Sequence, residues 1–201
     1  MDKPVAYGTF VKKGNETYRT SAYLQWGDST ESLGACLLLN PGSSKGVLDG
    51  KITIDPTMNQ LISFIHRIRE ESQERSGRLH IYNLFNLQEA SSEKAIIKFE
   101  NLVSSGEYDL EESLASAEEL KEHPWILLGW GVKYKSKWKN LNESKRKWME
   151  QITESNIPYF GKAHPKRNDY YHPCPRISTQ RSLLIEDFVR HYKQSFRASP
   201  M

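Results

Sequence analysis

Apolar runs of strand length, separated by segments with helical periodicity, constrain the fold of this chain more than any other feature. "ACLLL" at residues 35–39 is continuously apolar, as is typical of a strand in a parallel sheet that is covered on both faces. Further runs occupy residues 79–84, 125–131 and 158–160. Because helix-forming segments separate these runs, the pattern predicts an α/β fold: a three-layer sandwich with a central, mainly parallel sheet of about four strands.

The helix with the clearest signals follows the first run. Asp55 can cap it, Pro56 fits its first turn, and apolar residues then recur at helical spacing as far as Ile68. Capping and periodicity predict four more helices. These cover about residues 91–103, beginning after Ser91 or Ser92, and about residues 110–122, 138–153 and 180–195.

Two β-rich runs precede the first buried strand. They flank Gly14-Asn15, which predicts a β-hairpin within residues 1–30 as an N-terminal addition. A chain of 201 residues with 37% hydrophobic content can bury one substantial core. We therefore expect a single domain over residues 1–197 and a loose tail at residues 198–201.

Composition argues against several functional classes. No stretch approaches the roughly 18 apolar residues of a membrane span, and the start, Met1 to Pro4, lacks the layout of a signal peptide. We therefore expect a cytoplasmic protein without a membrane partner. The two cysteines and six histidines show no metal-ligand spacing, so we expect no metal and no other cofactor.

The net charge of +3 is unevenly distributed along the chain. Lysine and arginine, interleaved with aromatic residues, dominate residues 133–148 and recur at 162–167, whereas residues 89–122 are mostly acidic. The basic stretch is either a solvated helix face or a surface that binds phosphates.

Polar and small residues follow the apolar runs. In "LLLNPGSSKG" the first run stops at Asn40, the next strand ends in a similar way on Asn83 to Asn86, and Gly129 to Gly131 end the third. In parallel sheets, ligands bind beyond the carboxyl ends of the strands. We therefore expect a binding site that includes the carboxamides of Asn40 and Asn83, each of which offers donors and an acceptor.

Five motifs in order resemble the uracil-DNA glycosylase superfamily over roughly residues 35–188. They are "LNPGSS", "DPTMNQLISFI", "YNLFNL", "ILLGWGVKYKSKW" and "HPCPRIS". Together with "YRTSAYLQW", some of them also resemble an uncharacterised bacterial and phage family, domain of unknown function 1643. The first resemblance implies a glycosylase-like fold and removal of a base from DNA, whereas the second implies no activity.

The first resemblance implies a role for each matching residue. Asn40 would orient the attacking water, and His172 would bind the base oxygen as negative charge develops on the leaving pyrimidine. Asn83 would read a pyrimidine edge, and Pro41 would shape the turn. Gly42 lies where the uracil-specific branch has an aromatic residue that excludes the methyl group of thymine.

Further residues complete the expected site. Ser43 and Phe85 belong to the same base-binding segments, and Arg176 falls where a leucine wedge enters the duplex. We expect phosphate contacts from Ser178, which falls where a serine of the glycosylases binds phosphates, and from Lys133 and Lys135 because of their charge. The expected partner is therefore DNA or a nucleotide.

The chain departs from the glycosylase pattern in two ways. The tyrosine and histidine of the uracil-specific motif are absent after Pro41, which disfavours a strict uracil enzyme. The closing loop reads "HPCP" instead of "HPSP", and it follows Tyr170 and Tyr171, which would either line a pocket or block one.

Each candidate also has a purely structural interpretation. Asn40 is a favoured residue at the start of a turn, Asn83 could bind backbone at a strand end, and His172 and Arg176 could be ordinary loop and surface residues; Trp130 and Trp138 are of a type more often found in cores. Three functions thus remain open: a DNA glycosylase, a non-catalytic protein that binds a nucleotide in the same pocket, and a phage-type interaction protein that uses only its surface.

Overall fold

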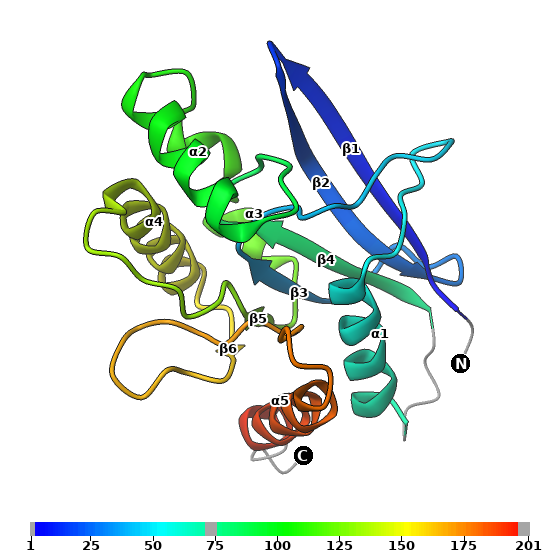
Figure 1. Ribbon diagram of the computed structural model, residues 1–201. Helices are drawn as coiled ribbons and strands as arrows, with labels where there is room; N and C mark the ends of the chain where they lie inside the picture. Colours follow the sequence, from blue (N-terminus) through cyan, green and yellow to red (C-terminus); the bar gives the residue numbers. More distant parts are fainter. Residues whose placement is uncertain (1–2, 71–75, 197–201) are drawn as a thin grey trace.

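A six-stranded mixed sheet forms the centre of the computed structural model, which describes residues 3–70 and 76–196 (Figure 1). The strand order is β1-β2-β4-β3-β5-β6. Neighbouring strands from β4 to β6 run parallel, whereas β1 and β2 are antiparallel to their neighbours. The strands are β1 Val5–Lys13, β2 Glu16–Trp26, β3 Ser32–Leu38, β4 Gly77–Asn83, β5 Ile126–Leu128 and β6 Tyr159–Phe160. The expected tail, residues 198–201, lies outside the described residues.

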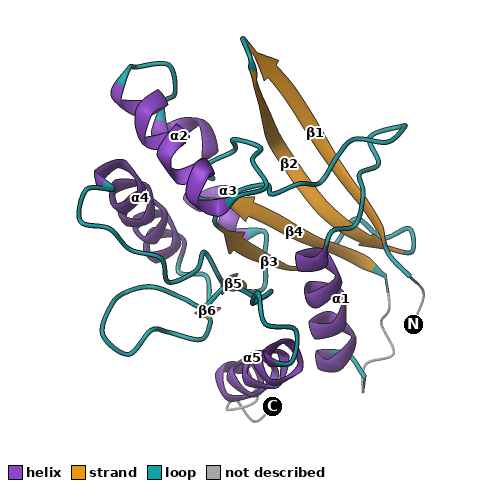
Figure 2. Ribbon diagram, viewed as in Figure 1, coloured by secondary structure: helices purple, strands orange, loops and turns teal. Residues whose placement is uncertain are grey.

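Helices cover both faces of the sheet. They are α1 Pro56–Ile68, α2 Ser92–Ser104, the 3₁₀ helix η1 Leu110–Ser113, α3 Ala117–Lys121, α4 Lys139–Ser155 and α5 Gln180–Phe196. Side chains of α1 and α5 pack in one apolar core, and those of α2, α3 and α4 pack in another on the opposite face. Figures 1 and 2 show these two groups on either side of β3 and β5. No helix in the described part of the chain is long and apolar enough to span a bilayer.

The prediction of an α/β fold is confirmed, but the predicted sheet of about four mainly parallel strands is wrong. The N-terminal hairpin is not a separate addition, because β2 pairs with β4 from Tyr23 opposite His80 to Trp26 opposite Gly77. Leu24 and Trp26 of β2 are almost fully buried in the core with α1 and α5. Burial of this apolar face joins the hairpin to the central sheet.

One predicted helix is also wrong. Residues 110–122 form the short helices η1 and α3 instead of one continuous helix. Asp109 and Ser116 each cap a separate start, and Leu114 between them is extended, with φ −84° and ψ 126°. Local side-chain caps thus compete successfully with the apolar periodicity across this segment.

Candidate functional site

A cavity of about 510 Å³ opens beyond the carboxyl end of β3. Its walls come from the turn after β3, the start of α1, the segment before α2, the segment after β5 and the loop before α5. Figure 2 shows that loops, not helices, carry the chain away from β5 and β6 on this side. Both the place, at the carboxyl end of a parallel strand, and the volume are typical of a small-ligand site.

Asn40 fixes the turn that follows β3. Its Nδ2 donates a hydrogen bond to the backbone oxygen of Glu89 at 2.8 Å and a long one to that of Leu87 at 3.5 Å. These bonds connect the end of β3 to the segment that leads into α2. Asn40 lines the cavity, and its Oδ1 has no partner among the described residues. It therefore offers a hydrogen-bond acceptor whose amide group is held in place.

Gly42 leaves this wall of the cavity open. Its φ of +68° is in the left-handed region, which favours glycine. A Cβ at this position would meet only Oδ2 of Asp55, at 3.8 Å. Pro41 beside it is buried and also lines the cavity, whereas Ser43 is exposed and is not among the lining residues.

His172 offers a neutral donor to the same cavity. The backbone N–H of Cys174 donates to its Nδ1 at 3.2 Å, and the backbone oxygen of Cys174 lies 3.4 Å from the same nitrogen. We assign the proton of the neutral ring to Nε2, because the N–H contact is the shorter of the two. Burial lowers the pKa of His172, and the contact with the backbone of Cys174 and the carboxylate of Asp55 offset this only in part. At neutral pH the side chain is therefore an uncharged imidazole with an Nε2–H available for a ligand.

Asn83 and Phe85 do not line the cavity. In the amide orientation that satisfies both neighbours, Asn83 donates to the backbone oxygen of Asn40 at 3.1 Å and accepts from Nη2 of Arg19 at 3.3 Å. Phe85 is fully buried and stacks on Phe99, with 4.3 Å between ring centroids. The structure thus brings Asn40 and His172 to one cavity and places Asn83 behind its wall.

Two residues of the cavity escape interpretation from the sequence. The sequence indicates Asp55 only as the cap of α1, and Asp55 does accept a hydrogen bond from Met58 N–H at 2.8 Å. Its other carboxylate oxygen also accepts a hydrogen bond from the Ser44 hydroxyl, at 3.0 Å. Asp55 is the one carboxylate among the described lining residues. Arg19, in β2, also lines the cavity although it is only 3% exposed. Neither periodicity nor a motif marks an arginine in an otherwise ordinary strand sequence.

A family model described as "Protein of unknown function (DUF1643)" matches residues 23–174. The chain belongs to this family. The match confirms the second resemblance seen in the sequence, whereas nothing found supports the first, and no curated protein matches the chain. The DUF1643 region includes Asn40, Asp55 and His172, while Arg19 and Arg176 lie just outside it.

Two of the four residues expected to contact DNA, Lys133 and Arg176, line the cavity, whereas Lys135 and Ser178 do not. Lys133 lines it and donates to the Ser92 hydroxyl at 2.9 Å, whereas Lys135 pairs with Glu93 at 2.6 Å. Arg176 is exposed and lines the rim, and Ser178 is exposed but is not a lining residue.

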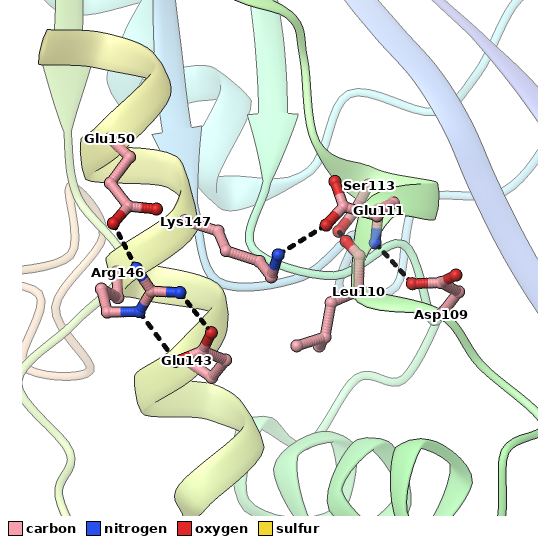
Figure 3. Close-up of polar contacts among 8 residues, drawn as sticks. All are labelled: Asp109, Leu110, Glu111, Ser113, Glu143, Arg146, Lys147 and Glu150. Carbon is pink, nitrogen blue, oxygen red and sulfur yellow. Dashed lines mark hydrogen bonds and ion pairs between the residues drawn. The ribbon is translucent and has the colours of Figure 1, made fainter. Parts of the chain in front are cut away.

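Much of the charge on α4 of the DUF1643 region is paired with acidic groups. Arg146 bridges Glu143 and Glu150 along the helix, and Lys147 reaches Glu111 of η1 at 2.6 Å (Figure 3). These contacts favour a solvated helix face for this part of the basic stretch. Lys137 and Lys139, in contrast, are exposed and have no ion pair among the described residues.

The aromatic candidates belong mainly to the core. Trp130 and Trp138 are 2% and 3% exposed, and the Trp130 indole donates to Asp169 at 3.1 Å. Tyr170 packs edge-on against Trp130, with 5.0 Å between ring centroids, and neither Tyr170 nor Tyr171 is a lining residue of the cavity. Among the described residues no group of three metal-binding side chains occurs.

Proposed function

We propose that this chain binds an extruded nucleotide of DNA in the cavity and removes a mismatched or modified pyrimidine by hydrolysis of its N-glycosidic bond. The observation that carries the proposal is that the Asn40 carboxamide, with its free Oδ1, and a neutral His172 line one cavity. Base removal needs a positioned water and a donor for the leaving base, and the base must first leave its stack. The order of motifs that resembles uracil-DNA glycosylases adds to this argument.

In this proposal Asn40 positions the water. Its Nδ2 is occupied by the backbone of Glu89, so its free acceptor is Oδ1, which can hold a water proton. A carboxamide is a weak base, but a water-holder suffices when the transition state resembles a sugar cation. We therefore expect slower turnover than an aspartate at this position would support.

His172 stabilises the leaving base in this proposal. As the glycosidic bond breaks, negative charge develops on the pyrimidine oxygens. A hydrogen bond from Nε2–H stabilises that anion more than it stabilises the neutral base. Because burial lowers the pKa of His172, its imidazole is neutral at pH 7. It therefore acts as a hydrogen-bond donor to the leaving base and not as a positively charged group.

Base selectivity follows from the shape of the cavity in this proposal. Asn83 does not line the cavity, so it does not read the base directly. Gly42 presents no side chain, which leaves room for a substituent at the 5-position of a pyrimidine. We expect weakly paired bases to be preferred, because they leave the stack at lower cost.

The test measures base release from duplexes that contain uracil, a thymine mismatch or 5-hydroxymethyluracil, with alkaline cleavage of the resulting abasic sites. Asn40→Ala should lower the rate on the order of 10²-fold or more and leave DNA affinity nearly unchanged, because a water-holder acts on the transition state. Loss of the bond to Glu89 should also cost about 1 kcal/mol of stability. Ser43→Ala, outside the cavity, is the matched control. No base release by the wild type on any substrate would contradict the proposal.

A second candidate is a protein that binds a nucleotide without catalysis. The charge of the cavity favours it: four cationic side chains and one carboxylate line the walls among the described residues. In that case a free nucleotide should stabilise the wild type against heat and Asn40→Ala should abolish this effect, while no duplex loses a base.

A further inference from the structure

We propose that Arg19 is an oxyanion-binding residue of this cavity and that the occupant carries a phosphate group. The proposal goes beyond base removal, because it concerns the charge of the occupant and applies whether or not a bond is broken. The phosphate belongs to a free nucleotide or to a nucleotide of a DNA strand, and the experiment below distinguishes the two.

The guanidinium of Arg19 is buried with most of its donors unused. The side chain is 3% exposed, and its Nε and Nη1 atoms have no hydrogen-bond partner within residues 3–70 and 76–196. These two nitrogens carry three of the five N–H donors of an arginine. The remaining nitrogen, Nη2, donates to Oδ1 of Asn83 at 3.3 Å. Among the described residues, Arg19 has no salt bridge, whereas buried arginines ordinarily have one.

A register shift in the hairpin places Arg19 on the inner side of β2. Ser21 pairs with Thr9, but Arg19 pairs with the next residue of β1, Phe10, so β2 has one extra residue there. The alternation of faces changes at this bulge: Tyr18 packs with α2 and α4, although Ala22, of the same parity, packs on the α1 side. Bulges re-aim side chains in this way and are frequent beside functional sites.

The buried charge of Arg19 favours an anionic occupant. Burial lowers the pKa of Arg19 to about 10, and the carboxylate of Asp55 offsets this only in part. The side chain therefore remains a cation at neutral pH. Asp55 already accepts from Ser44 and from the backbone of Met58, and it forms no ion pair with Arg19. An uncompensated buried cation is strongly unfavourable, so an anion that supplies acceptors to it should bind well.

Phosphate matches the remaining features of the cavity. A guanidinium presents a planar set of donors that suits phosphate oxygens. Lys133 and Arg176 add positive charge at the wall and the rim, while Leu38, Ile96 and Trp130 give apolar contacts suited to a base or sugar. The combination of a buried cation with apolar walls is the chemistry that a nucleotide requires.

The test compares wild type with Arg19→Met, which keeps an unbranched apolar side chain and removes the guanidinium with its charge. Thermal unfolding is followed with inorganic phosphate, dUMP, an oligothymidylate and the uncharged nucleoside deoxyuridine. Wild type should be stabilised by dUMP or the oligomer and not by deoxyuridine. Arg19→Met should be at least as stable as wild type without ligand, and its affinity for the anions should fall on the order of 10-fold or more. Arg78→Met, which removes an arginine of β4 that does not line the cavity, should respond like wild type.

The arms of the experiment also identify the source of the phosphate. A response to dUMP alone indicates a free nucleotide, and a response to the oligomer alone indicates DNA. If no anion stabilises wild type, or if Arg19→Met responds as wild type does, the proposal is overturned. Should Arg19→Met fail to fold, Arg19→Gln decides, since a full response without the positive charge would also overturn the proposal. None of these measurements requires base release, so failure of the proposed catalysis remains a separate result.

Discussion

Among single residues, the two carboxamides that end neighbouring strands have different tasks. Asn40 uses its amide group to hold the segment before α2 and keeps an acceptor at the cavity. Asn83 uses its side chain on the backbone of Asn40 and on Arg19. One carboxamide thus faces the cavity, while the other supports the turn and the buried cation behind it.

Gly42 is a single residue whose replacement tests base selectivity. Gly42→Tyr should exclude 5-substituted pyrimidines and spare uracil, because the ring would occupy the open wall beside Asp55. Any L side chain at a φ of +68° also costs about 1–2 kcal/mol of backbone strain. Gly42→Ala shares the strain without the ring and is the control. Relative rates of release of uracil and 5-hydroxymethyluracil measure the effect; equal selectivity in both variants would contradict it.

Among the helices and strands, the start of α1 joins fold and site. Asp55 caps the helix through a 2.8 Å bond to Met58 N–H and also holds Ser44 in the turn after β3. Asp55→Ala should therefore destabilise the protein by about 1–2 kcal/mol. Ser91→Ala at the start of α2 is the matched control, with a cap bond of 3.5 Å and a smaller expected cost. Urea unfolding compares them, and equal decreases in stability would contradict the second role of Asp55.

A chain of hydrogen bonds joins β3, β4 and α3 and predicts acid sensitivity. The His123 ring bonds Ser32 at 2.7 Å and Tyr82 at 2.8 Å, and Tyr82 donates to Glu119 of α3 at 2.7 Å. Burial, with a smaller contribution from His80, lowers the pKa of His123 to about 4. As pH falls, His123 therefore takes up a proton in the unfolded chain before it does so in the folded protein. The contribution of neutral His123 to the free energy of unfolding is complete above about pH 6.5 and disappears towards pH 4.

The corresponding measurement is urea unfolding at several pH values. From the ordinary pKa of 6.5 to about 4, the contribution of His123 amounts to about 3 kcal/mol. His123→Gln cannot take up this proton, so its stability should fall less than that of wild type between pH 7 and pH 4.5. His164→Gln, outside this network, should keep the wild-type slope. Parallel curves for wild type and His123→Gln would refute the assignment.

Across the whole molecule, the pairing of charges limits which cations can meet DNA. Arg146 and Lys147 are bound to glutamates, whereas Arg176, Lys137 and Lys139 have no ion pair among the described residues. If DNA binds at the cavity, replacing one of these three with glutamine should reduce the slope of log affinity against log salt by about 0.9 for each phosphate that is no longer neutralised. Arg146→Gln is the control, with little expected change. An affinity for DNA that does not change with salt concentration would favour a small ligand over DNA.

Local patterns in the amino-acid sequence were sufficient to locate most of the central elements. Continuous apolar runs located β3, β4 and β5, and a cap followed by helical spacing located α1 from Pro56. Because parallel strands place their carboxyl ends at one edge, these patterns also predicted a site that includes Asn40 and Asn83, whereas His172 was expected there only from the resemblance to uracil-DNA glycosylases. The inferences about these strands and this helix succeeded because each signal acts between residues that are neighbours in the chain or in a single strand.

Contacts between distant segments, in contrast, determined which strand ends face the cavity and what charge lies behind them. The pairing of β2 with β4 makes the hairpin part of the sheet. The bulge beside Thr9 turns the Arg19 side chain toward the cavity that it lines. Asn83 turned away from the cavity because the backbone of Asn40 and the guanidinium of Arg19 offered it partners. No local pattern encodes such outcomes, since a one-residue change of register moves a side chain to the other face of the sheet.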